Sequence, residues 1–313
     1  MLSGVVRRLG TALAAVLFST IVIFVLLRAL PGDVATTRLG TDATPQALAD
    51  LRREYGFDRP LIAQYFDWLI NIVRGDLGRS LLSGASVKDD VVSRLDVTLP
   101  LITASTVVSI MIAAAIGRRT ALRRDHGSGV LTMSLIQLGL AIPPFVLAIG
   151  LIFLFAVQFK VLPAGGFPVS GWGSFTEALR SLILPTVALA AAQTAMLTRF
   201  ARSSSLEFVA SDAFRTARAV GRPRNDALLT AQRLVLSPVL TVASLQVATL
   251  ITGAVVIESV FALPGLGSML VRDIANRDYP KVQSVLFVVV LVVFALRTIV
   301  DLANDRLDPR RVA

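Results

Sequence analysis

Six long apolar stretches, separated by polar segments, constrain this chain more than any other feature of its sequence. Five of them carry no charged residue, and the sixth carries only Arg297. Most are close to the roughly 20 residues that a helix needs to cross the apolar core of a bilayer. The sequence therefore predicts an all-α integral membrane protein with six transmembrane helices. The predicted spans are residues 9–27, 97–117, 127–159, 181–198, 234–257 and 282–300.

The composition excludes several classes of function. With 54% hydrophobic and 17% charged residues and a mean hydropathy of +0.72, the six spans leave no room for a soluble catalytic domain. The chain has no Cys and a single His, His126, so disulfides, thiolate chemistry and histidine metal clusters are excluded and no metal site is predicted. Arg7 and Arg8 precede the first span as in a signal peptide, but its uncharged run is too long for one, and we predict a retained span.

The net charge of +10 predicts the topology. The segments 1–9, 118–128, 199–237 and 303–313 hold 16 basic and 6 acidic residues, whereas the intervening segments hold 14 of each. Basic loops remain in the cytoplasm, so both termini are predicted to be cytoplasmic. Because the charge alternates between loops across apolar spans, it gives little support to nucleic-acid binding.

The segment 28–98 is predicted to be extracytoplasmic and to contain short amphipathic helices. Thr44 can cap a first helix that Gly56 ends, and a second is expected from Leu61 to about Gly75. A third is expected to start at Ser86 and to run into the second span. We expect these apolar faces to pack against one another or on the outer membrane surface.

The third span is too long for a straight crossing. Its 33 residues would extend for roughly 50 Å as a helix, against about 30 Å of hydrocarbon, so it must tilt, protrude or break. Pro143 and Pro144 stand in its middle and favour a kink there. A kink beside a translocation path and a kink used only for packing are equally compatible with this pattern.

Charged residues give no sign of a proton relay or voltage sensor inside the spans. Arg297 and Asp301 are four residues apart near the end of the last span, and we predict that they neutralise one another. The phosphate-binding pattern G-x-x-x-x-G-K-[ST] is absent. If ATP drives transport, another subunit must bind it.

The loop 199–237 is the most informative segment. Ser211 can cap a short helix that Gly221 and Pro223 end. The sequence of this helix resembles the EAA-type coupling loop of ABC importer permeases in the dipeptide, oligopeptide and nickel family. The resemblance is carried by Asp212, Ala213, Phe214, Arg215, Thr216, Ala217, Arg218, Ala219 and Gly221, with Val220 where that family usually has Lys.

Further strings extend the resemblance along the chain to the B-type permease subunit of that family. They are Leu30-Pro31-Gly32-Asp33, Tyr55-Gly56-Phe57-Asp58-Arg59-Pro60-Leu61, Gly75-Asp76-Leu77-Gly78, the run from Ile257 to Gly267, Arg277-Asp278-Tyr279-Pro280 and Asp308-Pro309-Arg310. The resemblance implies a type I ABC importer permease fold and a single permease domain over 1–313, with 199–237 as the cytoplasmic coupling loop. It also implies a C-type permease partner, two ATPase subunits that bind ATP and Mg²⁺, and an extracytoplasmic binding lipoprotein.

The resemblance further implies import across a bacterial inner membrane, with peptides as the expected substrate and nickel chelates, glutathione or another small solute as alternatives. The chain itself is expected to be neither an enzyme nor a cofactor carrier. A secondary transporter should show ionisable groups at mid-membrane, and an intramembrane enzyme should show convergent polar groups; neither pattern is evident. The stretch after the fifth span is expected to form part of an outer gate, although a Pro-Gly pair is also an ordinary turn signal. The gate candidates are Glu258, Phe261, Leu263, Pro264, Gly265 and Gly267.

Overall fold

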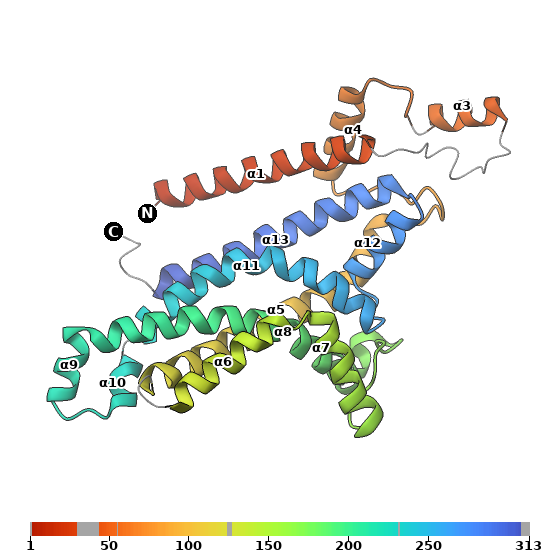
Figure 1. The fold of residues 1–313 in the computed structure, drawn as a ribbon. Helices are drawn as coiled ribbons and strands as arrows, with labels where there is room; N and C mark the ends of the chain where they lie inside the picture. The colour runs from red at the N-terminus through yellow and green to blue at the C-terminus, as the bar shows by residue number, and fades with distance from the viewer. Residues whose placement is uncertain (1, 30–43, 55, 124–126, 231, 308–313) are drawn as a thin grey trace. The chain divides into compact units, whose positions relative to one another are not determined.

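The computed structural model describes residues 2–29, 44–54, 56–123, 127–230 and 232–307, and all extended regular structure in these ranges is helical (Figure 1). The α-helices are α1 Leu2–Ala29, α3 Pro45–Glu54, α4 Leu61–Val73, α5 Val87–Leu122, α6 Gly127–Ala141, α7 Pro144–Leu151, α8 Phe175–Ala210, α9 Asp212–Ala219, α10 Arg224–Thr230, α11 Gln232–Val260, α12 Leu266–Ala275 and α13 Tyr279–Leu307. A π-helix covers Ile152–Gln158, and a 3₁₀ helix covers Gly171–Ser174.

Among the described residues, five helical segments are long and apolar enough to cross a membrane. They are Gly10–Ala29, Val87–Leu122, Gly171–Ala210, Val235–Val260 and Tyr279–Arg306. Each contains one of the predicted spans or most of it. The predicted third span, 127–159, is not among them.

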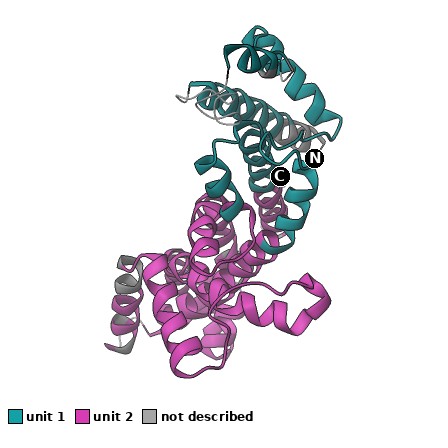
Figure 2. Cartoon of the chain, turned by 90° about the vertical axis from the view of Figure 1, so that its right-hand side faces the viewer, with its two compact units in different colours: residues 1–97, 268–294 teal, residues 98–267, 295–313 magenta. Residues whose placement is uncertain are grey.

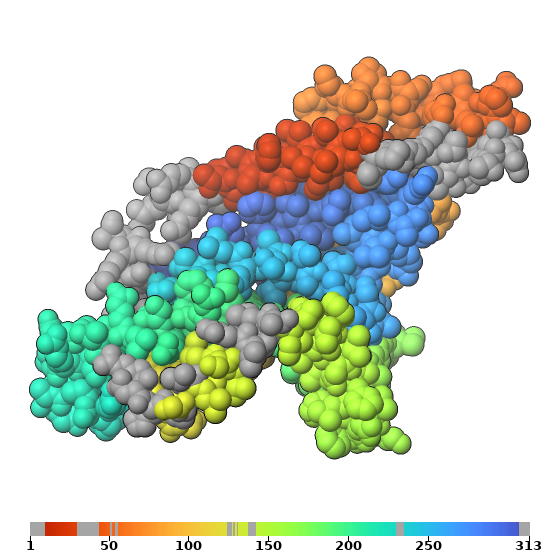
Figure 3. All heavy atoms as spheres, viewed as in Figure 1, coloured from red at the N-terminus to blue at the C-terminus, as the bar shows by residue number. Residues whose placement is uncertain are grey.

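The third apolar stretch breaks at its prolines. Pro143 adopts an extended backbone conformation, with ψ of 139°, and α7 begins at Pro144. Proline at the first helical position loses no hydrogen bond, whereas proline inside a helix would clash with the preceding turn. Figure 3 shows α6 and α7 diverging from one another. The stretch therefore forms two helices of about two to four turns, with the second extended by the π-helix Ile152–Gln158.

The chain divides into two compact units, shown in separate colours in Figure 2. The first comprises residues 1–97 and 268–294, and the second comprises residues 98–267 and 295–313. The boundary falls within α5, α12 and α13, so each of these helices contributes residues to both units. The expectation of one permease domain over 1–313 stays a prediction.

The first unit contains the predicted amphipathic helices. In α3, the amide of Ala47 donates to the Thr44 side chain at 3.3 Å, which confirms the predicted cap. Tyr55 lies outside the described residues, and Gly56 follows with a left-handed φ of +67°. The third helix, which was expected at Ser86, is the start of α5 at Val87 and continues into the span.

Helix α4 packs through the aromatic residues of its apolar stripe. The Tyr65 ring meets Phe24 of α1 edge to face, with 5.4 Å between centroids, and its hydroxyl lies 2.9 Å from the Thr20 hydroxyl. Trp68 meets Phe287 of α13 at 6.2 Å in a similar geometry. The apolar face of this helix therefore packs on α1 and α13, whereas we expected it to pack on the other amphipathic helices or on the outer membrane surface.

The second unit is built around α8, which packs against α6, α7 and α11. Helix α5 also approaches it closely. The hydroxyl of Ser109 donates to the Ala190 carbonyl at 3.2 Å, and a Cβ added at Gly117 would lie 2.5 Å from that of Ala201. Small and hydroxyl-bearing residues allow membrane helices to approach in this way. A buried cluster of Ala113, Leu197, Ala201, Val239 and Ala243 joins α5, α8 and α11.

Candidate functional site

The predicted coupling helix is α9, and both of its ends are capped. At the start, the Phe214 amide donates to the Ser211 side chain at 3.3 Å. At the end, the Gly221 amide donates to the Arg218 carbonyl at 3.0 Å, and the Arg222 amide donates to the Ala217 carbonyl at 3.2 Å. This pair of bonds is a Schellman motif, which requires the left-handed conformation that Gly221 adopts at φ of +86°. The helix therefore has a defined length of about two turns.

One face of α9 is held by its own chain. Phe214 is buried in a cluster with Ala227 and Leu228 of α10 and Val235 of α11, and its ring meets Phe208 of α8 edge to face. Ala217 packs against the same cluster and is half-buried. Its small size is therefore explained by packing within this chain.

The opposite face of α9 is exposed. Arg215 and Asp212 form an exposed ion pair at 2.8 Å, which contributes little to stability. Val220, where the family pattern usually has Lys, is 72% exposed. The exposed residues are Asp212, Ala213, Arg215, Thr216, Arg218, Ala219 and Val220. Sequence alone did not separate this face from the face that Phe214 anchors.

The loop continues as α10, residues Arg224–Thr230. Ala227 and Leu228 hold this helix to Phe214. Ala231 lies outside the described residues, and α11 begins at Gln232.

The predicted gate residues form a buried turn between α11 and α12. The Glu258 side chain is fully buried and accepts a hydrogen bond from the Thr98 hydroxyl of α5 at 2.6 Å. The same hydroxyl accepts from the Leu266 amide, at the start of α12, at 2.8 Å. The Leu263 amide donates to the Glu258 carbonyl at 2.8 Å. A carboxylate at the first turn of a helix is also favoured by the helix dipole, so this arrangement ties α5, α11 and α12 together.

Two glycines of this turn have no space for a side chain. A Cβ at Gly265 would lie 2.1 Å from the Glu258 carboxyl carbon, and one at Gly267 would lie 2.6 Å from the Val255 Cα. Phe261 and Leu263 are buried beside them, and Pro264 is partly exposed. The structure therefore brings the six gate candidates together.

A second loop closes over the turn. The Gly166 amide donates to the Phe261 carbonyl at 2.7 Å, and a Cβ at Gly165 would lie 2.4 Å from that oxygen. Sequence reasoning missed Thr98 and Gly165. Neither stands near Glu258 or Phe261 in the chain, and single threonines and glycines give no sequence signal of such a contact.

The first unit contains a buried polar cluster that sequence reasoning also missed. The Asp278 carboxylate accepts from the Ser80 hydroxyl at 2.5 Å and from the Leu81 amide at 3.2 Å. The Lys281 ammonium lies 2.6 Å from Asp90 and 3.4 Å from Asp273. Burial raises the pKa of the Asp273 carboxyl above its ordinary value, and the nearby Lys281 opposes this shift. These contacts join the loop before α5 to the connection between α12 and α13.

The predicted pair near the end of α13 is confirmed. Arg297 Nε lies 3.8 Å from an Asp301 carboxylate oxygen, and both side chains are about half exposed.

Comparison with known families identifies the chain. The family described as "Binding-protein-dependent transport system inner membrane component" matches residues 107–312, and the family of the N-terminal part of such components matches residues 1–102. The chain belongs to this family. As a binding-protein-dependent inner membrane component, it is a multi-pass membrane protein, and the predicted resemblance to ABC importer permeases is confirmed.

Its relatives are similar along their whole lengths. A putative peptide transport system permease of Brucella suis is 38% identical over 315 residues, and the match covers 99% of each chain. A di/tripeptide transport system permease of Pseudomonas aeruginosa is 35% identical, covering 99% of this chain and 98% of its own. A glutathione transport system permease of Escherichia coli O6:H1 is 33% identical over similar shares.

Proposed function

We propose that this chain is the permease subunit of an ATP-driven importer and forms half of a translocation pathway for peptides. A second, C-type permease forms the other half, two ATPase subunits bind ATP and Mg²⁺, and an extracytoplasmic binding protein delivers the substrate. Full-length similarity to two peptide permeases supports the substrate class. The charge distribution supports cytoplasmic termini.

The observation that carries the coupling role is the two-sided structure of α9. Phe214 fixes one face in the core of the second unit, and the other face presents the family string to solvent. A helix fixed in this way transmits force, because a partner that moves its exposed face must move α8, α10 and α11 as well. We propose that the exposed face docks in a cleft of an ATPase subunit.

The buried turn between α11 and α12 supports a role in gating. The Thr98 hydroxyl and the Glu258 carboxylate hold the start of α12 against α5 and α11. Displacing α12 there would break a buried, charge-assisted hydrogen bond, which opposes partial opening. We propose that the residues 258–267 form part of the outer gate, and that the break at Pro143 and Pro144 lies beside the path.

The experiment that tests this function is uptake by the complete importer in proteoliposomes. With ATP inside the vesicles and the binding protein outside, a labelled dipeptide or tripeptide should accumulate. Replacing Thr216 with Trp on the exposed face of α9 should abolish accumulation while the complex remains in the membrane. Uptake of glutathione without uptake of dipeptides would favour the second candidate, which the 33% identical glutathione permease supports. Accumulation of any substrate without ATP would refute an ATP-driven mechanism.

A further inference from the structure

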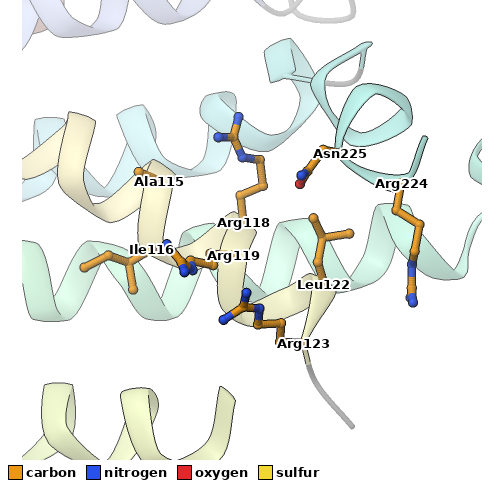
Figure 4. Close-up of a pocket in the computed structure, with 8 residues that line it drawn as sticks. All are labelled: Ala115, Ile116, Arg118, Arg119, Leu122, Arg123, Arg224 and Asn225. Atoms are coloured by element: carbon orange, nitrogen blue, oxygen red, sulfur yellow. The ribbon is translucent and has the colours of Figure 1, made fainter. Parts of the chain in front are cut away.

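A basic pocket lies at the end of α5 in the second unit. It has a volume of about 620 Å³ and is lined by Arg118, Arg119, Arg123, Arg224 and Asn225 together with Ala115, Ile116 and Leu122. Figure 4 shows Arg118, Arg119 and Arg123 on the last turns of α5 and Arg224 on α10, with their guanidinium groups pointing in different directions around the pocket. Among the described residues, no carboxylate forms an ion pair with any of these four arginines. Four cationic side chains therefore line the pocket.

The position of the pocket along α5 places it at the level of lipid headgroups. The uncharged run of this span ends at Gly117, and Arg118 and Arg119 follow it directly. A membrane-crossing helix changes from apolar to charged residues at the interface, where phosphates lie. The guanidinium group is suited to a phosphate because it can donate two parallel hydrogen bonds to it.

An apolar pocket adjoins the basic one. Its volume is about 300 Å³, and it shares Ala115 and Arg118 with the first. The rest of its lining comes from α5, α8, α10 and α11 and is mainly apolar: Ile110, Met111, Ala114, Ser205, Leu228, Leu229, Val235 and Leu236. A charged pocket that continues into an apolar one matches an amphiphile with an anionic head and a hydrocarbon tail.

We propose that these two pockets bind one anionic phospholipid, with its phosphate among the arginines and part of an acyl chain in the apolar pocket. An acidic segment of a partner protein would be attracted by the arginines but would leave the apolar pocket unfilled. Basic pockets between membrane helices are suited to anionic headgroups. Each arginine near the membrane surface increases the affinity for an anionic lipid roughly fivefold. Residues of α10 and α11 line the apolar pocket and also form the cluster around Phe214. A bound lipid would therefore stabilise the packing of α9 on these two helices.

The test is lipid retention by the purified full chain. The protein in detergent is given an equimolar mixture of phosphatidylglycerol and phosphatidylcholine, and bound lipids are counted by native mass spectrometry. The double variant Arg119→Gln and Arg123→Gln should lose about tenfold to thirtyfold of its preference for phosphatidylglycerol. The matched control is Arg199→Gln with Arg306→Gln, since these exposed arginines of the same unit line neither pocket and carry the same charge change. The control pair should retain the preference.

A second variant tests whether an acyl chain of the lipid occupies the apolar pocket. Ala115→Trp fills the junction of the pockets without changing charge, and it should reduce phosphatidylglycerol retention even if the double variant fails to fold. Equal retention of both lipids by the wild type, or equal losses in the double variant and its control, would overturn the proposal. Displacement of the lipid by millimolar glycerol phosphate would show a site for a soluble anion instead. Unchanged lipid retention with loss of ATPase binding would show that the arginines contact a partner protein.

Discussion

Substitution of Gly265 by Ala should destabilise the second unit through the buried carboxylate of Glu258. The added Cβ would lie 2.1 to 2.3 Å from the carboxyl carbon and both oxygens of that side chain. The carboxylate cannot keep its position, so it loses the hydrogen bond from Thr98 while it remains fully buried. Overpacking costs about 1–3 kcal/mol and a lost charge-assisted bond costs about 1.5–3 kcal/mol, which gives roughly 2.5–6 kcal/mol in total.

A suitable assay measures the thermal midpoint of the purified chain in detergent. The signal is the fraction of protein that stays monodisperse after heating to each temperature. A loss of this size should lower the midpoint by about 5 °C or more for a chain of this length. The control is Gly150→Ala, because a Cβ at this helical glycine meets nothing within 4 Å, and alanine favours the helix. If Gly265→Ala melts within about 1 °C of the wild type, then Glu258 does not occupy the position on which this argument depends.

Three further predictions concern coupling, pH dependence and topology. Ala219→Trp on the exposed face of α9 should leave the protein inserted in the membrane but lower substrate-stimulated ATPase activity of the complex about tenfold or more. The control Ser203→Trp, exposed on α8, should not lower this activity. Equal activities of the two variants would show that the loop 199–237 is a simple connector. The pKa of Asp273 is raised in the folded state, so its contribution to stability is present below the ordinary carboxyl pKa and falls as the pH rises through the raised value. Asp273→Asn should therefore flatten the dependence of the melting midpoint on pH between the ordinary and the raised pKa. An unchanged dependence would show that the Asp273 carboxyl does not have a raised pKa in the folded state. In intact cells, Cys introduced at Ser83 should react with an impermeant maleimide, whereas Cys at Ser203 should react only after permeabilisation, and the reverse pattern would invert the topology.

The sequence by itself determined the features that depend on local chemistry. Apolar length predicted five helices that are long and apolar enough in the structure to cross a membrane, because a bilayer demands about 20 consecutive apolar residues. Ser211 and Gly221 predicted both ends of α9, since a capping hydroxyl and a left-handed turn are properties of single residues. Pro143 and Pro144 indicated where the third stretch departs from one helix.

Only the tertiary structure decided which groups meet across the chain. Thr98 reaches Glu258 over 160 residues, and Ser80 reaches Asp278 over 198, and no local pattern encodes such contacts. The same holds for the lipid site, since a run of arginines after a span usually indicates only topology. It becomes a pocket because Arg224 and Asn225, in another helix, line it together with the end of α5, and because folding places the apolar pocket beside it. A side chain's partners depend on the packing of whole helices, and that packing is a property of the assembled unit.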